Sequence, residues 1–428
     1  MDNKFLVALA TLLTSTASGC MPGQAARRSA FDATPDSARV RGDIQFLASD
    51  ALQGRGTGTA GNDSAAAFAA RRYASLGLSA IVPGYLQPFS ARSAVLARQG
   101  GASELRTQNV VAYLAGTDPA LRGQVIVIGA HFDHLGRSTV GALDPEAKDA
   151  IRNGADDNAS GTAAVLELAR LLPTRPTRRS VVFVNFSGEE LGLLGSQHFV
   201  EHSPVPLDSV VAMLNFDMVG RMRGDSVIVY GVATAREMPA VLDSANARFG
   251  LAVRALGDGF GPSDHSSFFA RNIPVLHFFT NLHEDYHRAT DDVERINAAG
   301  AARVIALAEQ VVREIDRRDA RLTFVRSSTP PVAAGARTGS NVYLGSIPDM
   351  AAPDIKGLRL TGVRAGSPAD SAGLKPGDVV VELGGKPVTD LESYSTALYS
   401  FKPGDVVEIV VLRGEVRLKM AVRLGQRG

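Results

Sequence analysis

The sequence has no tryptophan, a single cysteine and no excess of either charge sign. Lys and Arg total 45 against 44 Asp and Glu, so the formal net charge is +1 and a nucleic-acid partner is not expected. One cysteine cannot form a disulfide framework within the chain. No apolar run reaches the roughly 20 residues that span a bilayer. These absences favour a globular protein, and 428 residues are enough for two or three domains.

Imidazole and carboxylate residues follow three apolar runs that have strand character. The runs and their following residues are 124–130 with His131, 181–186 with Glu189 and Glu190, and 210–216 with Asp217. The apolar runs alternate with helical patterns, which predicts βαβ units and an α/β fold. In such sheets, ligands bind beyond the carboxyl ends of the strands. Imidazole and carboxylate groups there can hold zinc with open positions for water, as in a hydrolase.

Five sequence blocks resemble one family. They are residues 129–136, 154–161, 187–192, 215–218 and 286–287. Together they are similar to the co-catalytic zinc aminopeptidases, the family of bacterial leucyl aminopeptidases and glutamate carboxypeptidase. The resemblance covers about residues 40 to 315. It implies a three-layer αβα zinc-peptidase domain with a mixed, mostly parallel central sheet, which we place at 41–320.

The resemblance also implies a site with two Zn²⁺ ions per chain, with Co²⁺ or Mn²⁺ as alternatives. The implied ligands, with Asp157 shared between the ions, are His131, Asp157, Glu190, Asp217 and His287. Glu189 would be the general base, Asp133 would orient the imidazole of His131, and Tyr286 would hydrogen-bond the developing oxyanion. Asp264 and His265 are expected in the wall of the substrate pocket or behind the ligands. Three other histidines of this region are expected in local structure or core: His134, His277 and His283.

Each block also has an interpretation without metal. Ser187 and Glu190 have the spacing of a helix capping box, which excludes a metal role for the Glu190 side chain. The segment 156–158 could be a turn that precedes a helix, and Asp217 could end a strand in solvent. For Asp264 and His265 the alternative is a solvated loop.

Residues 341–426 predict a second, smaller unit that is rich in β structure. Its strand-like runs are 359–363, 379–383, 406–412 and 416–423. Residues 367–378 resemble the central segment of bacterial PDZ domains, which implies a peptide-binding loop at Leu344, Gly345, Ser346 and Ile347. Main-chain N–H groups beside a sheet edge would there bind a C-terminal peptide. The alternative is a closed structural module. Residues 321–340, with two adjacent prolines, are expected to be a linker.

The N-terminal residues 1–19 predict a signal peptide. An apolar run at 5–13 follows Lys4 and is too short to span a bilayer. Small residues precede Cys20, a pattern that resembles the lipobox of bacterial lipoproteins and implies lipidation of Cys20. Residues 20–40 would then be a tether, with the lipid as the only membrane contact, and the protein would be a lipoprotein of the periplasm or outer membrane. An ordinary cleaved signal with an incidental cysteine is the alternative.

These features together predict a secreted di-zinc metallopeptidase that removes N-terminal residues from peptides. Two alternatives share the fold: a carboxypeptidase and a single-zinc glutaminyl cyclase. A third is a receptor-like protein without activity, whose working part is the PDZ-like unit. The complete ligand set favours two ions over one, and the intact Glu189 favours an enzyme.

Replacement of Cys20 tests the lipid anchor. We expect Cys20→Ala to move the protein from the membrane fraction to the soluble fraction with unchanged specific activity, because stable anchoring needs the acyl chains on this residue. Fractionation and a peptidase assay measure both quantities. Unchanged membrane partition of the variant would contradict the lipoprotein prediction.

Overall fold

The computed structural model describes most of the chain from Thr34 onward. The described residues are Met1, 34–92, 104–139, 141–144, 146–257, 259, 261, 263–325, 342–348, 356–363, 366–389, 393–394, 397–398 and 400–426. The expected signal peptide, Cys20 and most of the expected linker lie outside them. Among the described residues, no helix is long and apolar enough to cross a membrane.

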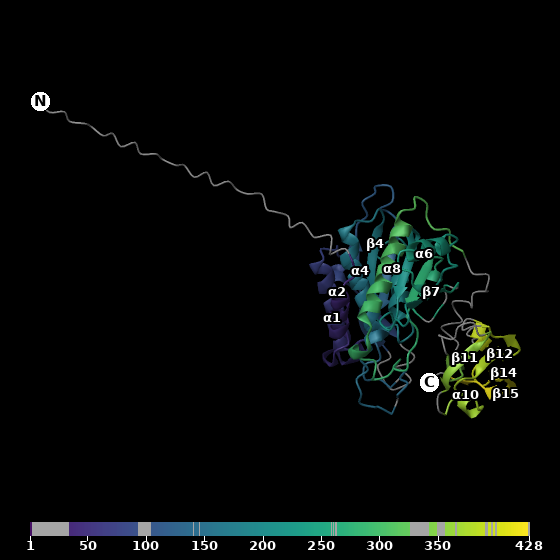
Figure 1. Cartoon of the computed structure of the whole chain (residues 1–428). Helices are drawn as coiled ribbons and strands as arrows, with labels where there is room; N and C mark the ends of the chain where they lie inside the picture. Colours follow the sequence, from purple (N-terminus) through teal and green to yellow (C-terminus); the bar gives the residue numbers. More distant parts are fainter. Residues whose placement is uncertain are drawn as a thin grey trace. The chain divides into compact units, whose positions relative to one another are not determined.

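A mixed sheet of eight strands forms the centre of the N-terminal domain, in the order β1-β2-β4-β3-β5-β8-β6-β7 (Figure 1). The strands are β1 (Leu86–Arg92), β2 (Glu104–Leu114), β3 (Val125–His131), β4 (Ser180–Phe186), β5 (Val210–Phe216), β6 (Ser226–Tyr230), β7 (Ala252–Ala255) and β8 (Val275–Phe279). The central pairs β4–β3, β3–β5 and β5–β8 are parallel, as is β6–β7. The other neighbours are antiparallel. The predicted mixed, mostly parallel sheet is confirmed.

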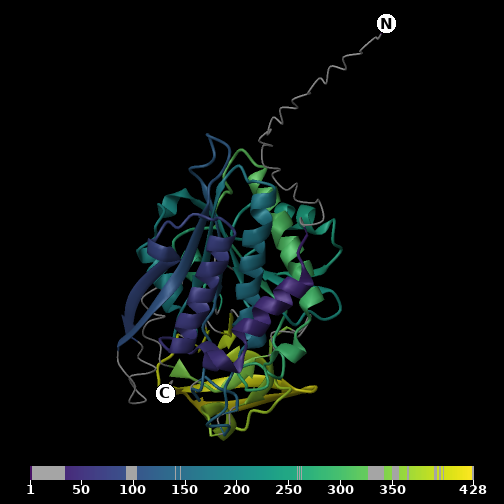
Figure 2. The same ribbon diagram turned by 90° about the vertical axis from the view of Figure 1, so that its left-hand side faces the viewer.

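Helices cover both faces of this sheet. One face packs against α1 (Ser37–Leu47), α2 (Ala60–Ser75), α4 (Gly161–Leu171), α6 (Met238–Asn246) and α8 (Ala298–Asp316). Figure 2 shows α1, α2, α4 and α8 side by side over that face. The other face packs against α5 (Leu194–Glu201) and α7 (His265–Phe269). The three-layer αβα architecture is therefore confirmed.

The central strands are apolar along their whole length because both of their faces are buried. In β3, Ile126 and Ile128 belong to the core on the α4 side, and Val125 and Val127 belong to the core on the α5 side. Every residue of β3, β4 and β5 is buried. A strand that is covered on both faces reads as a continuous hydrophobic run rather than an alternating one, which is why the sequence located these strands well.

The parallel register brings the strand ends to a common level. His131 pairs with Phe186, and Gly129 pairs with Asn215, so β3, β4 and β5 end at the same edge of the sheet. Residues just beyond each strand then face one another across this edge, where open α/β sheets place their ligand sites.

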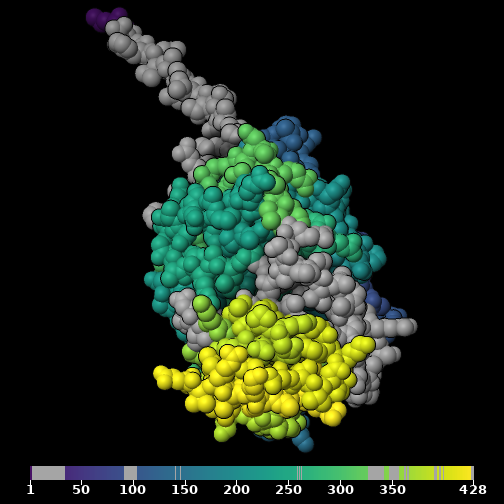
Figure 3. Space-filling view, turned by 90° about the vertical axis from the view of Figure 1, so that its right-hand side faces the viewer, coloured from purple at the N-terminus to yellow at the C-terminus, as the bar shows by residue number. Residues whose placement is uncertain are grey.

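The C-terminal unit is an antiparallel β structure with its own core. Its main sheet has the order β10-β11-β12-β14-β15, with β13 beside β12, and β9 pairs with β16. The elements are β9 (Val342–Tyr343), β10 (Ser346–Pro348), β11 (Leu358–Val363), α10 (Pro368–Ser371), β12 (Val379–Leu383), β13 (Lys386–Pro387), β14 (Val406–Arg413), β15 (Val416–Arg423) and β16 (Gly425–Gln426). The last strands lie at the surface, in yellow in Figure 3, and most of β15 is exposed or half-buried.

The predicted peptide-binding loop precedes the edge strand β10. Leu344 is buried in the core of the C-terminal unit, and Ser346 and Ile347 begin β10, which pairs on one side with β11. Gly345 has φ of +85°, and a Cβ atom there would lie 2.2 Å from the Cβ of Ser367, so the turn requires glycine.

The domain edges differ by a few residues from those expected. Helix α1 begins at Ser37, inside the expected tether, because Asp36 accepts hydrogen bonds from the N–H groups of Ala38 and Arg39 as an N-cap. Residues 321–325, expected in the linker, run along the N-terminal domain: Thr323 O accepts from the N–H of Arg236.

Separate cores predict separate folding. We expect deletion of residues 341–428 to leave the hydrolysis of dipeptide-sized substrates largely intact, because the candidate ligands and catalytic residues all lie in the first domain, whose two main cores contain no residue of the C-terminal unit. Circular dichroism would establish that the truncated protein is folded, and a dipeptide assay would measure its turnover. A folded truncation that has lost turnover would show that the C-terminal unit completes the site.

Candidate metal centre

The five predicted ligands line one cavity of about 110 Å³ at the carboxyl edge of the sheet. His131 ends β3, Asp217 follows β5, and Glu190 lies in the turn after β4. Asp157 lies in η4 (Ala155–Ser160), the turn before α4, and His287 follows β8 after a longer loop. Four different strand ends therefore supply the site.

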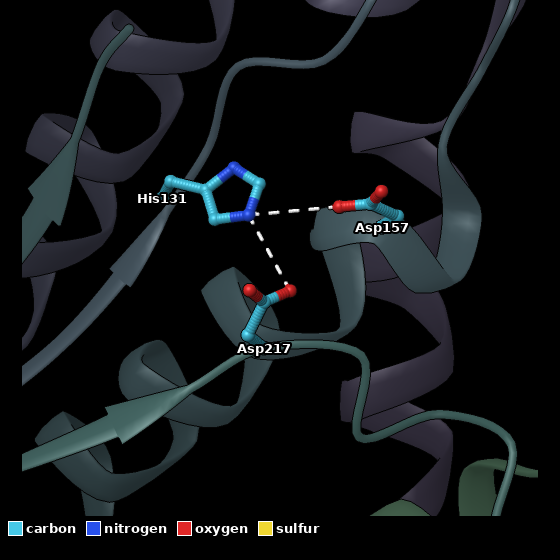
Figure 4. Close-up of side chains that lie close together, drawn as sticks. All are labelled: His131, Asp157 and Asp217. Atoms are coloured by element: carbon cyan, nitrogen blue, oxygen red, sulfur yellow. Dashed lines mark ion pairs between the residues drawn. The ribbon is translucent and has the colours of Figure 1, made fainter. Parts of the chain in front are cut away.

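The first cluster consists of His131, Asp217 and one oxygen of Asp157. The Nε2 atom of His131 lies 3.5 Å from Asp157 Oδ1 and 3.4 Å from Asp217 Oδ1, as Figure 4 shows. Ligands at 2.0–2.1 Å from a tetrahedral zinc ion are about 3.3 Å apart. The three atoms therefore fit one zinc ion with an open fourth position.

The second cluster consists of His287, Glu190 and the other oxygen of Asp157. The Nε2 atom of His287 lies 3.1 Å from Asp157 Oδ2 and 3.4 Å from Glu190 Oε2. These separations are those of neighbouring zinc ligands. The three-residue group whose donor atoms all lie within 4.8 Å of one another here is His134, Asp157 and Glu190, with His287 beside Asp157 and Glu190. Asp157 thus presents one oxygen to each cluster, as a carboxylate shared by two ions would.

Main-chain oxygens hold both imidazoles. Nδ1 of His131 lies 3.2 Å from the carbonyl oxygen of Asp133, and Nδ1 of His287 lies 2.9 Å from that of Gly141. An Nδ1–H group that donates to a carbonyl leaves the Nε2 lone pair for a metal. The Asp133 carboxylate is 3.7 Å from His131 Nδ1 and instead accepts from the N–H of Glu189 and the hydroxyl of Thr57. Both the carbonyl and the carboxylate of Asp133 therefore face Nδ1 of His131, with the carbonyl the nearer acceptor.

The two adjacent aspartates of η4 have different environments. The carboxylate of Asp156 is hydrogen-bonded within the protein. It accepts hydrogen bonds from the hydroxyl of Ser160, from the N–H of Gly220 and from His283, whose Nε2 is 3.1 Å away. Asp291 accepts from the N–H groups of both Asp156 and Asp157 at 3.0 Å and holds the turn. Only Asp157 therefore presents its carboxylate to the cavity, and His283 has the local structural role that was expected.

Burial and mutual repulsion dominate the electrostatics. Burial, with the neighbouring Glu190 and Asp217, raises the pKa of Glu189 well above its usual value, and burial also raises the pKa of Glu190. Burial opposes the protonation of His287, but Glu190 and Asp157 outweigh it and raise its pKa to about 9. Four carboxylates in one buried cavity are stable only beside cations, which this donor set is suited to bind as zinc.

Two of the non-metal interpretations, the capping box at Glu190 and the solvated loop at Asp264 and His265, do not fit the structure. Helix α5 begins at Leu194 with Leu193 at its N-cap, so Ser187 and Glu190 form no capping box. Glu190 instead lies beside His134 and His287. Asp264 and His265 are fully buried, which excludes a solvated loop. Burial raises the pKa of Asp264 to about 7.

The wall of the cavity contains a histidine that the sequence analysis assigned to the core. His277 is buried and lines the cavity, with the ring of His265 stacked on it at 4.5 Å. The amide nitrogen of Asn215 lies 2.8 Å from Ser263 Oγ and 3.0 Å from His277 Nδ1. Ser263 in turn hydrogen-bonds to Asp217. A chain of hydrogen bonds thus connects the candidate ligand Asp217 to His277 in the pocket wall. Its members come from segments that lie far apart in the sequence, so no sequence motif predicts the chain.

Two further residues complete the site. Tyr286 lines the cavity and stacks on His287 with ring centroids 3.8 Å apart. Burial and the nearby carboxylates raise the pKa of Tyr286 well above its usual value, so its hydroxyl keeps its proton. His134, which was expected in local structure, lies with Nδ1 2.8 Å from Glu190 Oε1. Its position three residues after His131, inside a recognised block, was the signal that could have identified it.

Two known families match separate parts of the chain. The family described as "Peptidase family M28" matches residues 109–312, and the family described as "PDZ domain" matches 320–424. Aminopeptidase YwaD of Bacillus subtilis is 33% identical over 176 residues, which is 38% of this chain and 38% of that protein. Leucine aminopeptidase 2 of Trichophyton rubrum is 28% identical over 220 residues, 45% of this chain and 41% of that protein. The matched segments thus span about two fifths of these curated relatives.

A solved structure has the same fold. The zinc aminopeptidase BSAP of Bacillus subtilis superposes with a TM-score of 0.55 at 18% sequence identity, over 69% of this chain and 99% of that chain. At this identity the likeness establishes the fold of the N-terminal domain.

Metal removal should make stability depend on pH. His287 has a pKa of about 9 in the folded protein against 6.5 for an ordinary histidine. This difference in pKa contributes up to about 3 kcal/mol to the free energy of unfolding. The contribution is complete below pH 6.5 and is lost as the pH rises through 9. We expect chelator-treated protein to show a falling melting temperature from pH 6.5 to 9. Zinc-loaded protein should not show this fall in melting temperature. Equal pH profiles for both forms would contradict the assignment of His287 as a zinc ligand.

Proposed function

We propose that this chain, which belongs to peptidase family M28 and carries a C-terminal PDZ domain, is a di-zinc aminopeptidase that acts on peptides. The observation that carries the proposal is the position of Asp157, whose two oxygens belong to two clusters of zinc-compatible geometry. A single-zinc glutaminyl cyclase would not need the second cluster.

The residues of the cavity have separate tasks in peptide hydrolysis. When bound, zinc would polarise the scissile carbonyl and lower the pKa of water. Glu189 lies in the cavity, 3.9 Å from His131 Nε2, and remains outside both clusters. It would accept the proton of the attacking water and transfer it to the leaving amine. Its raised pKa suits a group that must take up and release a proton. The protonated hydroxyl of Tyr286 would donate to the carbonyl oxygen as negative charge develops there.

The charge of the cavity favours an amino terminus over a carboxyl terminus as the recognised end. Among the described residues that line it, none is lysine or arginine, so no fixed cation is available for a substrate carboxylate. The carboxylate of Glu189, in contrast, can bind an ammonium group. An aminopeptidase is therefore favoured over a carboxypeptidase.

The apolar wall of the cavity favours an apolar first residue of the substrate. The side chains that line it beyond the clusters include Met218, Tyr230, Phe279 and Leu282. Burial of an apolar side chain against them would stabilise the bound peptide by roughly 25 cal/mol per Å².

The remaining parts of the proposal concern location and the second domain. We propose that the protein acts outside the cytoplasm as a lipoprotein anchored through Cys20, in the periplasm or at the outer membrane. The edge strand β10 and the turn at Gly345 would bind the C-terminal peptide of a substrate or partner by adding a strand to the sheet.

The adjacent glutamates separate catalysis from metal binding. Glu189→Gln keeps the size of the side chain but removes the proton acceptor, so we expect turnover to fall by about 10²–10⁴-fold. The metal content should stay at two ions per chain. Peptidase kinetics and metal analysis by mass spectrometry measure the two quantities.

Glu190→Gln is the matched variant, because it makes the same chemical change one residue away. We expect it to lower the occupancy of one ion, with activity partly restored at high zinc concentration. If Glu189→Gln loses metal and Glu190→Gln keeps both ions, the two roles are exchanged. Full activity of Glu189→Gln would refute the general-base assignment.

A further inference from the structure

Two consecutive residues at the end of β3 contact the two consecutive glutamates beyond β4. The carboxylate of Asp133 accepts a hydrogen bond of 3.2 Å from the N–H of Glu189. The imidazole of His134 lies with Nδ1 2.8 Å from Oε1 of Glu190. The segment that supplies His131 to the first cluster therefore also reaches the second cluster, through Glu190.

The ring of His134 is held firmly in this place. It is buried, and its main chain forms a bridge with Gly56 and a 3.4 Å hydrogen bond to the carbonyl of Arg55. Gly154 packs directly against the ring: a Cβ atom there would lie 2.5 Å from His134 Cδ2. The neighbouring ring of His287 meets it edge-on at 5.7 Å. The contact with Glu190 is therefore imposed by the fold.

The geometry gives the two oxygens of Glu190 different partners. Oε1 faces His134, whereas Oε2 lies 3.4 Å from His287 Nε2, inside the second cluster. A metal-bound carboxylate has no proton to donate, so the hydrogen in the His134 contact comes from Nδ1. A carboxylate that is bound through one oxygen is commonly oriented by a hydrogen bond to the other.

We propose that His134 is a positioning residue for the second cluster, donating from Nδ1 to Oε1 of Glu190 and so directing Oε2 to the ion. This inference rests on the proposed two-ion site. It makes the two ions unequal, because the first cluster has no contact with His134 other than through Asp157. Loss of His134 should weaken the binding of one zinc ion and leave the other unchanged.

A direct ligand role for His134 is the competing assignment. Its Nδ1 is 3.7 Å from Asp157 Oδ2, and His134, Asp157 and Glu190 are close enough to share an ion. Asparagine discriminates between the roles, since its amide nitrogen takes about the place of histidine Nδ1 and can donate a hydrogen bond but does not bind zinc. Glutamine places its amide nitrogen farther from the main chain and should not replace His134.

The test measures zinc binding by the full-length protein in competition with a chromophoric chelator. For His134→Ala we expect one zinc site to weaken by about 10–100-fold, with the other unchanged. His134→Asn should restore most of this affinity, and His134→Gln should not. The exposed His202 provides the matched control: His202→Ala should bind like the wild type. Circular dichroism of each metal-free variant confirms that it is folded.

Four outcomes would overturn the proposal. Wild-type affinities of both sites in folded His134→Ala would show that Glu190 needs no positioning residue, with the proposed function intact. Equal losses in His134→Asn and His134→Ala would make His134 a ligand. Binding of one zinc ion by the wild type would refute both the two-ion function and this inference. If His134→Ala does not fold, the test rests on His134→Asn. A folded His134→Asn whose affinity for one zinc ion is 10-fold or more below that of the wild type would then contradict the proposal.

Discussion

The crowding of negative charge in one small cavity is the constraint on which the site depends. Asp157, Glu189, Glu190 and Asp217 all line it, and like charges in a buried space cost free energy unless cations accompany them. Within the protein, the buried guanidinium of Arg55 lies nearby and is itself held by the carbonyls of Leu47, Phe132, Asn153 and Gly154. Burial lowers its pKa to about 10, so it stays charged. Burial, and after it the neighbouring carboxylates, raise the pKa of Glu189, and the same crowding suits the cavity to cations.

The sequence predicts the strand ends well and the contacts between them poorly. Strand β4 was located to within one residue, because a doubly covered strand is apolar almost without interruption. The five ligand positions came from recognised blocks, and the structure brings them together. His277 is buried as expected, but the contacts of His134 and His277 were not predicted, because each partner lies far away along the chain. Glu190 lies 56 residues from His134, and Asn215 lies 62 residues from His277. Sheet register creates both pairs, and no local pattern encodes it.

Asp133 illustrates the same limit at shorter range. Its position two residues after His131 predicted a carboxylate–imidazole contact, and the pair lies at 3.7 Å. The sequence did not predict that the carbonyl of Asp133 is nearer to His131, or that the carboxylate accepts hydrogen bonds from Glu189 and Thr57. Sequence spacing places a residue near a partner but does not fix which of its oxygens is used. Both contacts still place Asp133 between the first cluster and the general base.

The hydrogen bond that orients His287 limits how freely the loop around Gly141 can be exchanged in this protein. The loop that carries Gly141 also carries Asp144, whose carboxylate accepts from the N–H of Ala289, while Leu143 donates to the carbonyl of His287. A graft that exchanged this loop to change the preferred substrate would also remove the acceptor that orients His287. The orientation of His287 therefore depends on this loop, and directed evolution that varied the loop would have to select for metal binding at the same time.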